Sequence, residues 1–462
     1  MSITKFLLVF AIIFLPSLLL AGNGQPAAPP EGFSFLNLLR GMLGMAVVIG
    51  IAYLLSSDRK AISWRIVGIG LSFQLIIALA VLKIPFIKTA FEYMGMFFIK
   101  VLEFTKSGSE FVFGSLMDTD SFGVIFAFQI LPTIIFFSAL TSLLFYLGII
   151  QKIVYGLAWL LTKTLRISGS ESLSAAGNIF LGMTESPLLI KEYLEKMNRS
   201  EMFLVMVGGL ATIAGSVLGI YIGILGGDNY EGQLMFAKHL ITASVMAAPG
   251  AVVLAKILVP QTKPIKSDIK ITKDDIGSNV LESIANGTTQ GIRLAVNVGA
   301  MLIVFIAMVY MFNFLLLKIG NWTALNESIM QLTAGRYEGL SLQFILGYSL
   351  APLTWLLGVP AADMAVVGQL FGEKIILNEM VAYFSFRNSL AAGAFVYDKS
   401  IIMTTYMLCG FANISSIGII LGGIGALAPG KKTMLSQLGF KALVGGAMAS
   451  LLSAALIGII LG

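Results

Sequence analysis

The sequence is short of charge, of cysteine and of histidine. Charged residues make up 12% of the 462 residues, and 57% are hydrophobic, whereas a typical soluble domain has about 25% charged residues. The one cysteine, Cys409, excludes an internal disulfide, and the one histidine, His239, argues against Ser-His catalysis and His-rich metal sites. The formal charge of +6 lies in loops between apolar segments, so we expect no nucleic-acid partner. This composition predicts an all-α polytopic membrane protein in a lipid bilayer.

Apolar segments long enough to cross a bilayer recur along the chain. A helix over residues 85–110, whose charges recur at helical spacing, is expected to lie in the membrane interface. Lys and Arg gather in alternate loops, which places those loops in the cytoplasm and the C-terminus outside. The expected spans are residues 35–55, 66–84, 122–150, 202–225, 235–259, 291–317, 401–427 and 440–461.

The N-terminal segment has features of a targeting signal. Residues 1–22 combine Lys5 with a short apolar run, which favours a secretory signal peptide, and the alternative is an uncleaved extra helix. Residues 25–32 are rich in Pro and Gly and predict a linker on the outer side.

Two further stretches are apolar but interrupted, so that each apolar piece is too short to cross the bilayer. The first, residues 155–195, has Glu185 in its polar centre, and the second, residues 340–383, has Glu379 near its end. These stretches predict two re-entrant helical hairpins, one entering from each side of the membrane.

Polar residues also interrupt two of the spans, at residues 209–216 and 409–416. Hydrocarbon offers no hydrogen-bond partners, so such groups must face protein, water or a ligand. Residues 209–213 align without gaps on residues 410–414, and the order span, hairpin, interrupted span, span occurs twice in opposite orientation. The pattern predicts inverted repeats with two broken transmembrane helices and a binding site where hairpins and breaks meet, near the midplane.

Several side chains at these points could bind a solute. Glu185 and Glu379 are carboxylates in apolar surroundings, where the charged form is energetically costly. They could accept hydrogen bonds from a ligand, or they could serve as hairpin caps or as structural ion-pair partners. Asn413 and Ser416 lie three residues apart, as on one helical face, and could bind a ligand or join two helices. Phe411 could stack on a planar ligand or only pack.

A hard cation could bind where the helices break. Asn178 and Thr212 offer side-chain oxygens, and broken helices free backbone carbonyls. Oxygen ligands and the negative ends of half-helices suit Na⁺.

Four motifs in this order make the chain resemble the concentrative nucleoside transporter family, over residues 35–462. The matching pieces are Gly182-Met183-Thr184-Glu185-Ser186-Pro187, Gly209-Leu210-Ala211-Thr212-Ile213-Ala214-Gly215-Ser216, Leu377-Asn378-Glu379-Met380-Val381-Ala382-Tyr383 and Cys409-Gly410-Phe411-Ala412-Asn413-Ile414-Ser415-Ser416. The resemblance implies a homotrimer in the inner (plasma) membrane, with a scaffold and an elevator-type transport domain. It also implies nucleoside import with Na⁺ as coupling ion and no organic cofactor.

The resemblance also assigns roles by motif position. Met183, Thr184 and Glu185 would face the nucleobase, with Phe411 near it. Glu379, Asn413 and Ser416 would bind the ribose hydroxyls. The side chains of Asn178 and Thr212, with the carbonyls of Leu181 and Ile213, would hold Na⁺. The implied domains are residues 1–34 (signal peptide or extra helix), 35–150 (scaffold), 151–260 (first transport part), 261–339 (loop, scaffold span and outer loop) and 340–462 (second transport part).

Two positions depart from many family members, which have Gln in place of Met183 and Ser in place of Thr212. A Gln amide can both donate and accept at a base edge, whereas a thioether hardly can. The Met183 and Thr212 pairing resembles purine-preferring relatives and predicts a lean toward purine nucleosides.

Three other functions remain open at this point. The first is proton coupling, with Glu185 as the proton carrier. The second is an intramembrane enzyme that uses Glu185 and Glu379 as a catalytic pair, against which stands the shortage of His and Cys. The third is a channel, against which stand the paired hairpins and the lack of a charged pore ring.

Overall fold

The computed structural model describes residues 35–122, 125–227, 229–265, 278–333 and 335–462, and these ranges are helical without a β-strand. The expected all-α architecture is therefore confirmed. The predicted signal peptide and linker, within residues 1–34, lie outside the described residues.

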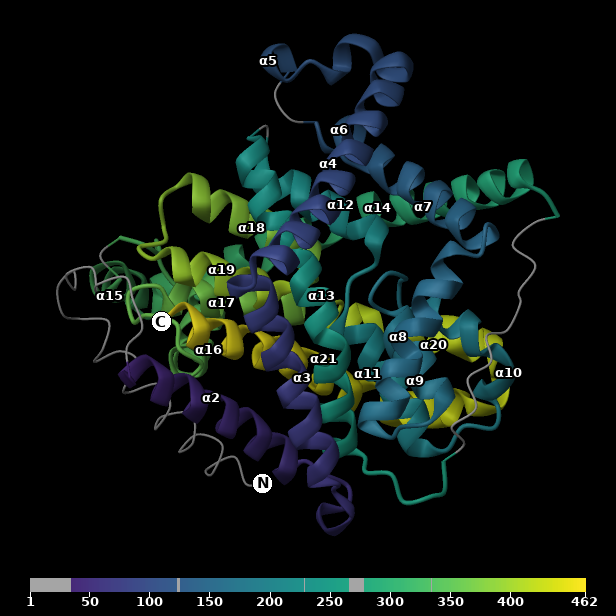
Figure 1. Ribbon diagram of the computed structural model, residues 1–462. Coiled ribbons are helices and arrows are strands. Elements are labelled where there is room, and N and C mark those ends of the chain that lie inside the picture. Colours follow the sequence, from purple (N-terminus) through teal and green to yellow (C-terminus); the bar gives the residue numbers. More distant parts are fainter. Residues whose placement is uncertain (1–34, 123–124, 228, 266–277, 334) are drawn as a thin grey trace. The chain divides into compact units, whose positions relative to one another are not determined.

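The chain divides into two compact units, whose main helices are labelled in Figure 1. Among the described residues, unit 1 comprises 35–48, 302–333, 335–408 and 454–462, and unit 2 comprises 49–122, 125–227, 229–265, 278–301 and 409–453. The main helices of unit 1 are α2 (Phe35–Leu54), α15 (Leu325–Leu332), α16 (Leu342–Leu356), α17 (Met364–Ile376), α18 (Glu379–Ala391) and α19 (Asp398–Leu408). Those of unit 2 are α3 (Trp64–Lys83), α4 (Pro85–Phe113), α7 (Leu131–Tyr146), α8 (Ile149–Leu165), α9 (Gly169–Gly177), α10 (Lys191–Leu194), α11 (Arg199–Ala211), α12 (Gly215–Gly226), α13 (Tyr230–Leu258) and α20 (Ile414–Leu427). The helices α14 (Val280–Trp322) and α21 (Lys432–Leu461) each run from one unit into the other.

Seven helices within the described residues are long and apolar enough to cross a membrane. In their most apolar windows, 94% of the residues of α13 and 89% of those of the α11–α12 segment are buried, against 28% in α3 and 11% in α14. Exposed apolar helix faces are expected where the surroundings are lipid, so the protein is a multi-pass membrane protein. The eighth expected span, residues 401–427, consists instead of two shorter helices, α19 and α20.

Side-chain caps determine where several helices of unit 2 begin. The Asn198 side chain accepts hydrogen bonds from the backbone N–H groups of Ser200 (2.9 Å) and Glu201 (3.1 Å), and Glu201 accepts from the Asn198 N–H (3.0 Å). Ser168 and Glu171 form the same reciprocal arrangement at α9. Such capping boxes satisfy two otherwise unpaired N–H groups at a helix start, so they position α9 and α11.

The first hairpin is shorter than its sequence suggested. The stretch from residue 155 onward begins inside α8, a separate helix. The arms are α9 and a 3₁₀ turn, Ser186–Ile190, that leads into α10. The expected span at residues 122–150 is also shorter in the structure, where the apolar span is Phe126–Tyr146 and its main helix α7 carries Pro132 in the first turn. Proline fits the first turn of a helix, where its missing N–H is not needed.

The second hairpin begins later than expected. Its arms are α17 and α18, which pack on each other, and its tip is Leu377-Asn378 directly before Glu379. The preceding helix α16 packs on α17, as α8 packs on α9. The order of elements is therefore repeated more completely than the sequence indicated, with one further helix before the hairpin in each half.

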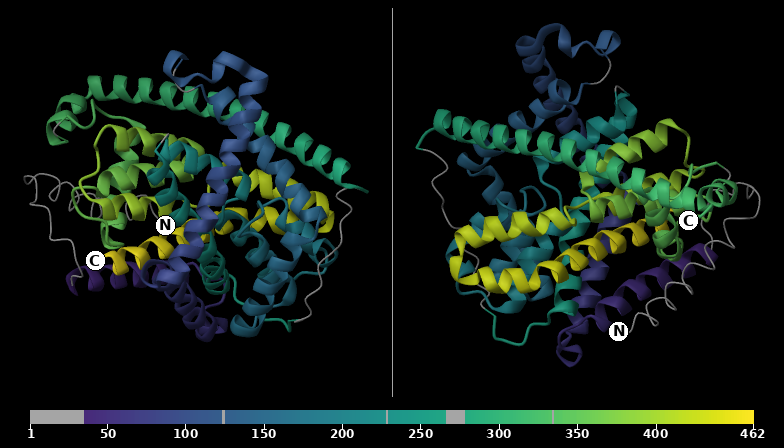
Figure 2. Two further views of the ribbon diagram at one scale, coloured as in Figure 1. Left: turned by 45° about the horizontal axis from the view of Figure 1, so that its top comes forward. Right: turned by 180° about the vertical axis from the view of Figure 1, so that it is seen from behind.

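Both broken helices are confirmed. The first breaks between α11 and α12, and the second between α19 and α20. Figure 2 shows that α20 and the first part of α21 lie side by side, where Gly439 lets Ile417 approach. The same figure shows α14 as one unbroken helix. It has 43 residues and is longer than the expected 291–317, and the outer loop after it contains α15.

Candidate functional site

The first break leaves oxygen atoms at the end of a helix. Thr212 caps the C-terminus of α11 with extended backbone (φ −112°, ψ 168°), and its hydroxyl donates to the carbonyl of Gly208 at 2.9 Å. Because the hydroxyl proton is used in this bond, the lone pairs of the oxygen remain available to a cation. Helix C-termini carry partial negative charge, so this end of α11 favours positive charge.

The tip of the first hairpin lies against this break. Asn178 follows α9, is 1% exposed, and its Oδ1 is buried without a hydrogen-bond partner. A Cβ at Gly208 would come within 3.0 Å of the Asn178 amide, and a Cβ at Gly209 within 2.8 Å of Met183 Cβ. The glycines of α11 therefore admit the hairpin tip at close range, which brings Asn178 and Met183 to the break.

Backbone contacts hold the tip in this place. Phe180 accepts a hydrogen bond through its carbonyl from the Gly215 N–H (3.0 Å), and the Ser244 hydroxyl donates to the Ile179 carbonyl (3.0 Å). Within the described residues, the carbonyls of Leu181 and Ile213 accept no hydrogen bond from the protein. These two carbonyls, with Asn178 Oδ1 and Thr212 Oγ1, are the oxygens that were predicted to hold Na⁺, and oxygen ligands of this kind suit a hard cation.

The second break presents the opposite end of a helix. Asn413 caps the N-terminus of α20, and its Oδ1 accepts from the Ser416 N–H (2.8 Å) and the Ser415 hydroxyl (2.7 Å). The expected common helical face of Asn413 and Ser416 is thus replaced by a cap, because Asn413 precedes the helix. Helix N-termini favour electron-rich oxygens, which suits a hydroxyl-bearing ligand better than a cation.

The two breaks cross each other directly. The Phe411 N–H donates to the Thr212 carbonyl at 3.3 Å. Gly410 has φ +109°, and a Cβ there would lie 2.6 Å from the Ala211 carbonyl oxygen. Only glycine fits this combination of backbone conformation and close approach, so the breaks are packed against one another.

Thr184 and Glu185 complete this part of the site. A Cβ at Gly423 of α20 would come within 3.1 Å of Thr184 Cγ2, so the hairpin tip also packs on α20. The Oε2 atom of Glu185 is buried without a hydrogen-bond partner. Unit 2 therefore brings together every predicted binding residue except Glu379: Asn178, Leu181, Met183, Thr184, Glu185, Thr212, Ile213, Phe411, Asn413 and Ser416.

Glu379 belongs to unit 1, where it is the first residue of α18. The Asn378 side chain caps this helix by accepting from the Val381 N–H at 2.9 Å. A carboxylate in the first turn is stabilised by the helix dipole. Its part in one site with the residues of unit 2 stays a prediction.

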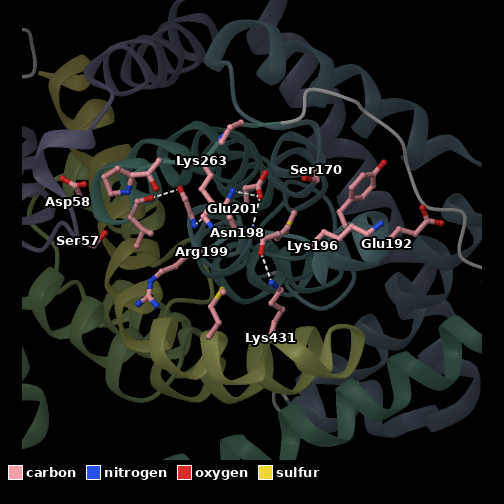
Figure 3. Close-up of a pocket in the computed structure, with 18 residues that line it drawn as sticks. Ser57, Asp58, Ser170, Glu192, Lys196, Asn198, Arg199, Glu201, Lys263 and Lys431 are labelled. Carbon is pink, nitrogen blue, oxygen red and sulfur yellow. Dashed lines mark hydrogen bonds between the residues drawn. The ribbon is translucent and has the colours of Figure 1, made fainter.

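A cavity of about 1040 Å³ with several charged side chains in its lining lies elsewhere in unit 2, at the start of α11 (Figure 3). Its labelled side chains carry both positive and negative charges. Lys431 Nζ already donates to the Met197 carbonyl (2.9 Å), and Glu201 already accepts from the Asn198 N–H in the cap of α11. A second cavity of about 410 Å³ is apolar and reaches Phe180 and Gly215 behind the first break. The linings of these two cavities include none of the predicted nucleoside-binding residues.

One buried ion pair was not predicted from the sequence. Lys256 forms a buried ion pair with Glu171, with exposures of 2% and 0%. Lys256 lies at the end of a span and is followed by a basic loop, so it resembled an ordinary cytoplasmic flank. A reciprocal Ser168-Glu171 cap was readable from the spacing, but its partner 85 residues away was not.

The fold and site define a membrane transporter built from repeated hairpins and broken helices. Three family models match the chain: Na⁺ dependent nucleoside transporter N-terminus at residues 43–116, nucleoside recognition at 127–228, and Na⁺ dependent nucleoside transporter C-terminus at 239–458. The chain therefore belongs to the Na⁺ dependent nucleoside transporter family, and it is a transporter and not an enzyme.

Relatives and solved structures agree with this assignment. An uncharacterized transporter of Haemophilus influenzae is 40% identical over 432 residues, which cover 92% of this chain and 99% of the relative. Sodium/nucleoside cotransporter 1 of Rattus norvegicus is 40% identical over 433 residues, which cover 90% of this chain and 63% of the rat protein. A solved structure of CNTnw in an inward-facing substrate-bound state has a TM-score of 0.83 and 37% identity, covering 92% of this chain and 99% of that one.

Proposed function

We propose that this chain is a sodium-coupled symporter that imports nucleosides across the inner (plasma) membrane. The observation that carries the proposal is the buried, unpartnered Oδ1 of Asn178 beside the C-terminus of α11. A buried polar atom without a partner costs free energy, so a bound cation there has a physical reason. The name of the rat relative, a sodium/nucleoside cotransporter, supports the same ion.

The nucleoside would lie at the second break, against the N-terminus of α20. The residues around Asn413 offer amide and hydroxyl groups, which match the hydroxyls of a ribose. Glu185 and Glu379 would accept from ligand donors, and Phe411 would lie near the base. Because Phe411 N–H is bonded to the Thr212 carbonyl, the cation and the nucleoside would occupy adjoining places. This adjacency gives each ligand a way to raise the affinity of the other, as coupled transport requires.

Counterflow in proteoliposomes tests this function directly. A panel of nucleosides is offered at fixed pH, with and without a Na⁺ gradient. We expect saturable exchange that depends on Na⁺. Exchange that is indifferent to Na⁺ at every concentration rejects sodium coupling, and a nucleoside that emerges chemically altered rejects transport.

The sodium ligands give the first mutational prediction. Asn178→Leu and Thr212→Val should each raise the half-saturating Na⁺ concentration at least about 10-fold, since one lost ligand on the order of 1.4 kcal/mol changes affinity tenfold. Na⁺ titration of nucleoside uptake measures the effect. Thr242→Val is the matched control, because its hydroxyl also donates to the carbonyl four residues earlier, Lys238, at 2.6 Å, but lies inside the unbroken helix α13. An equal shift in the control would show that only helix stability had changed.

Base preference gives the second prediction. Met183 at the hairpin tip offers a thioether to the base, and we propose that this favours purine nucleosides. Met183→Gln should raise the uptake of uridine relative to inosine by roughly 2- to 10-fold, the effect of one hydrogen bond of about 0.5–1.5 kcal/mol. Competition between the two nucleosides measures the ratio. The idea fails if uridine and thymidine already outcompete inosine and adenosine in the unmodified protein.

Proton coupling is a second candidate, and the buried Oε2 of Glu185 favours it. A carboxyl group with one unpartnered oxygen is costly to ionise at membrane depth, so it could carry a proton. Uptake driven by a pH gradient without Na⁺, and lost in Glu185→Gln, would support this candidate.

The assembly and topology are part of the same proposal. We expect a homotrimer with the C-terminus outside, and a transport domain (residues 151–260 and 340–462) that moves against a scaffold (residues 35–150 and the span in 261–339). Cysteine accessibility at the C-terminus and the mass of the detergent-solubilised protein test the orientation and the trimer.

A further inference from the structure

The second cavity of unit 2, of about 410 Å³, has no charged side chain among the described residues that line it. Its polar side chains are the hydroxyls of Tyr93, Thr141 and Ser244, and the Ser244 hydroxyl already donates to the Ile179 carbonyl at 3.0 Å. Sites for small molecules have volumes of roughly 300–1,000 Å³ and mostly apolar walls. The cavity therefore has the size and the lining of a site for an apolar molecule.

Close contacts between helices fix the walls of this cavity. The rings of Phe98 in α4 and Phe137 in α7 stack with their centroids 5.6 Å apart. A Cβ at Gly219 of α12 would lie 2.7 Å from the Phe137 ring, so α7 and α12 also approach each other closely. Walls around an unfilled space lose van der Waals contacts, and apolar cavities take up apolar molecules in preference to water. An apolar occupant therefore has a physical reason to bind here.

The exposed residues of the lining lie on two helices and mark the mouth of the cavity. Tyr93 of α4 is 65% exposed and Ile153 of α8 is 47% exposed, whereas Ile179 and Leu218 at the inner end are 8% and 3% exposed. Exposed apolar side chains of a membrane protein face lipid, and tyrosine is common at the edge of the bilayer. The molecules at the mouth are therefore membrane lipids, and the part of a lipid that matches an uncharged, apolar lining is its acyl chain.

We propose that this cavity binds one acyl chain of a membrane lipid and that the bound chain slows nucleoside uptake. The inner end of the cavity includes Phe180 and Gly215, whose backbone hydrogen bond (3.0 Å) holds the first hairpin tip at the first break. The chain would therefore lie directly behind the candidate sodium site, in contact with the segment between Asn178 and Leu181.

The effect on uptake rests on the proposed transport function, whereas the binding of the chain does not. In that proposal α4 and α7 belong to the scaffold, and the hairpin tip and α12 belong to the part that moves against it. The cavity has walls on both parts, so its shape changes during the movement. A ligand that fits one arrangement of the walls stabilises that arrangement, and each transport cycle must leave it.

A photoreactive lipid tests the binding in proteoliposomes of the full chain. The probe is a phosphatidylcholine that carries a diazirine at the end of one acyl chain. After irradiation, peptide mass spectrometry should find the label at Ile179 and Leu218, which lipid around the outside of the protein does not reach. Leu144→Trp places an indole in the cavity and should lower this labelling at least about 10-fold. Leu143→Trp is the matched control, since Leu143 is also half-buried on α7 but does not line the cavity, and its labelling should be unchanged.

Uptake by the labelled protein tests the second part of the proposal. A chain that is attached inside the cavity cannot leave it, so nucleoside uptake should fall in proportion to the fraction of protein labelled at Ile179 and Leu218. Irradiation with the same lipid lacking the diazirine should leave uptake unchanged. Full uptake by labelled protein overturns the slowing effect.

The labelling pattern of the unmodified protein decides the binding even if Leu144→Trp fails to fold. Label that is confined to outward-facing residues such as Ile153 shows surrounding lipid only and overturns the proposal. A cavity that is filled or covered by another subunit gives the same negative result. An unlabelled protein that transports no nucleoside would instead reject the proposed function, while the label at Ile179 and Leu218 would still establish the lipid site.

Discussion

The Asn413→Ala protein is expected to lose nucleoside uptake at least about 100-fold while it remains folded and trimeric. Asn413 stands at the second break, where its Oδ1 accepts from the Ser416 N–H (2.8 Å) and the Ser415 hydroxyl (2.7 Å). Alanine removes this helix cap, at a cost of about 1 kcal/mol, which a protein of this size can tolerate. In our proposal it also removes contacts to the ribose and disorders the groups around them. Two hydrogen bonds of roughly 1–3 kcal/mol each account for the expected loss.

Two further variants separate the proposed ligand-binding role of Asn413 from its role as the N-terminal cap of α20. Asn413→Asp keeps an oxygen at the cap but cannot donate, so it should restore the stability of α20 and still transport poorly. Asn229→Ala removes the comparable cap of α13, in which Asn229 accepts from the Glu231 N–H at 3.2 Å, and should leave uptake unchanged. Uptake is measured in proteoliposomes, and folding by the detergent-stability curve and the trimer mass. Normal uptake by Asn413→Ala would remove the centre of the proposed site.

The second large effect concerns stability. Glu171→Gln and Lys256→Met should each destabilise the protein by roughly 3–5 kcal/mol, the usual cost of leaving one buried charge unpaired. Lys256 Nζ also donates to the Ser200 hydroxyl (2.9 Å), and Glu171 Oε2 accepts from the Ser168 N–H (2.9 Å). The pair therefore ties the start of α9 to α11 and α13, the helices that hold the first hairpin.

Thermal unfolding in detergent measures this effect, with a double-mutant cycle to isolate the pair. The double variant should be less destabilised than the sum of the single variants, because it leaves no unpaired charge. Lys88→Met is the matched control, since Lys88 and Glu92 form a more exposed pair at 3.9 Å that should contribute less than about 1 kcal/mol. Single variants of the buried pair that stay within that range would show that it adds nothing to stability.

Much of the architecture could be predicted from the sequence, because polar residues inside apolar segments are recognised from the sequence without knowing which residues are in contact. The interruptions at residues 209–216 and 409–416 marked both breaks, and Glu185 and Glu379 marked both hairpins. The boundaries were less certain, because a helix that ends inside an apolar run leaves no change of composition. For this reason the span expected at residues 122–150 included Ile149, which belongs to α8.

By itself, the sequence determined the class of fold, the repeat and the residues that form the crossed breaks. The gap-free alignment made Thr212 and Asn413 equivalent in position, and the family resemblance gave them different roles, but only the tertiary structure showed a physical reason for the difference. Thr212 closes one half-helix and Asn413 opens another, so they stand at helix ends of opposite polarity. Backbone direction at a break, and partners such as Glu171 and Lys256 that lie 85 residues apart, depend on packing between distant segments. No local pattern records that packing, and in our proposal it supplies the physical reason why the cation binds at one break and the nucleoside at the other.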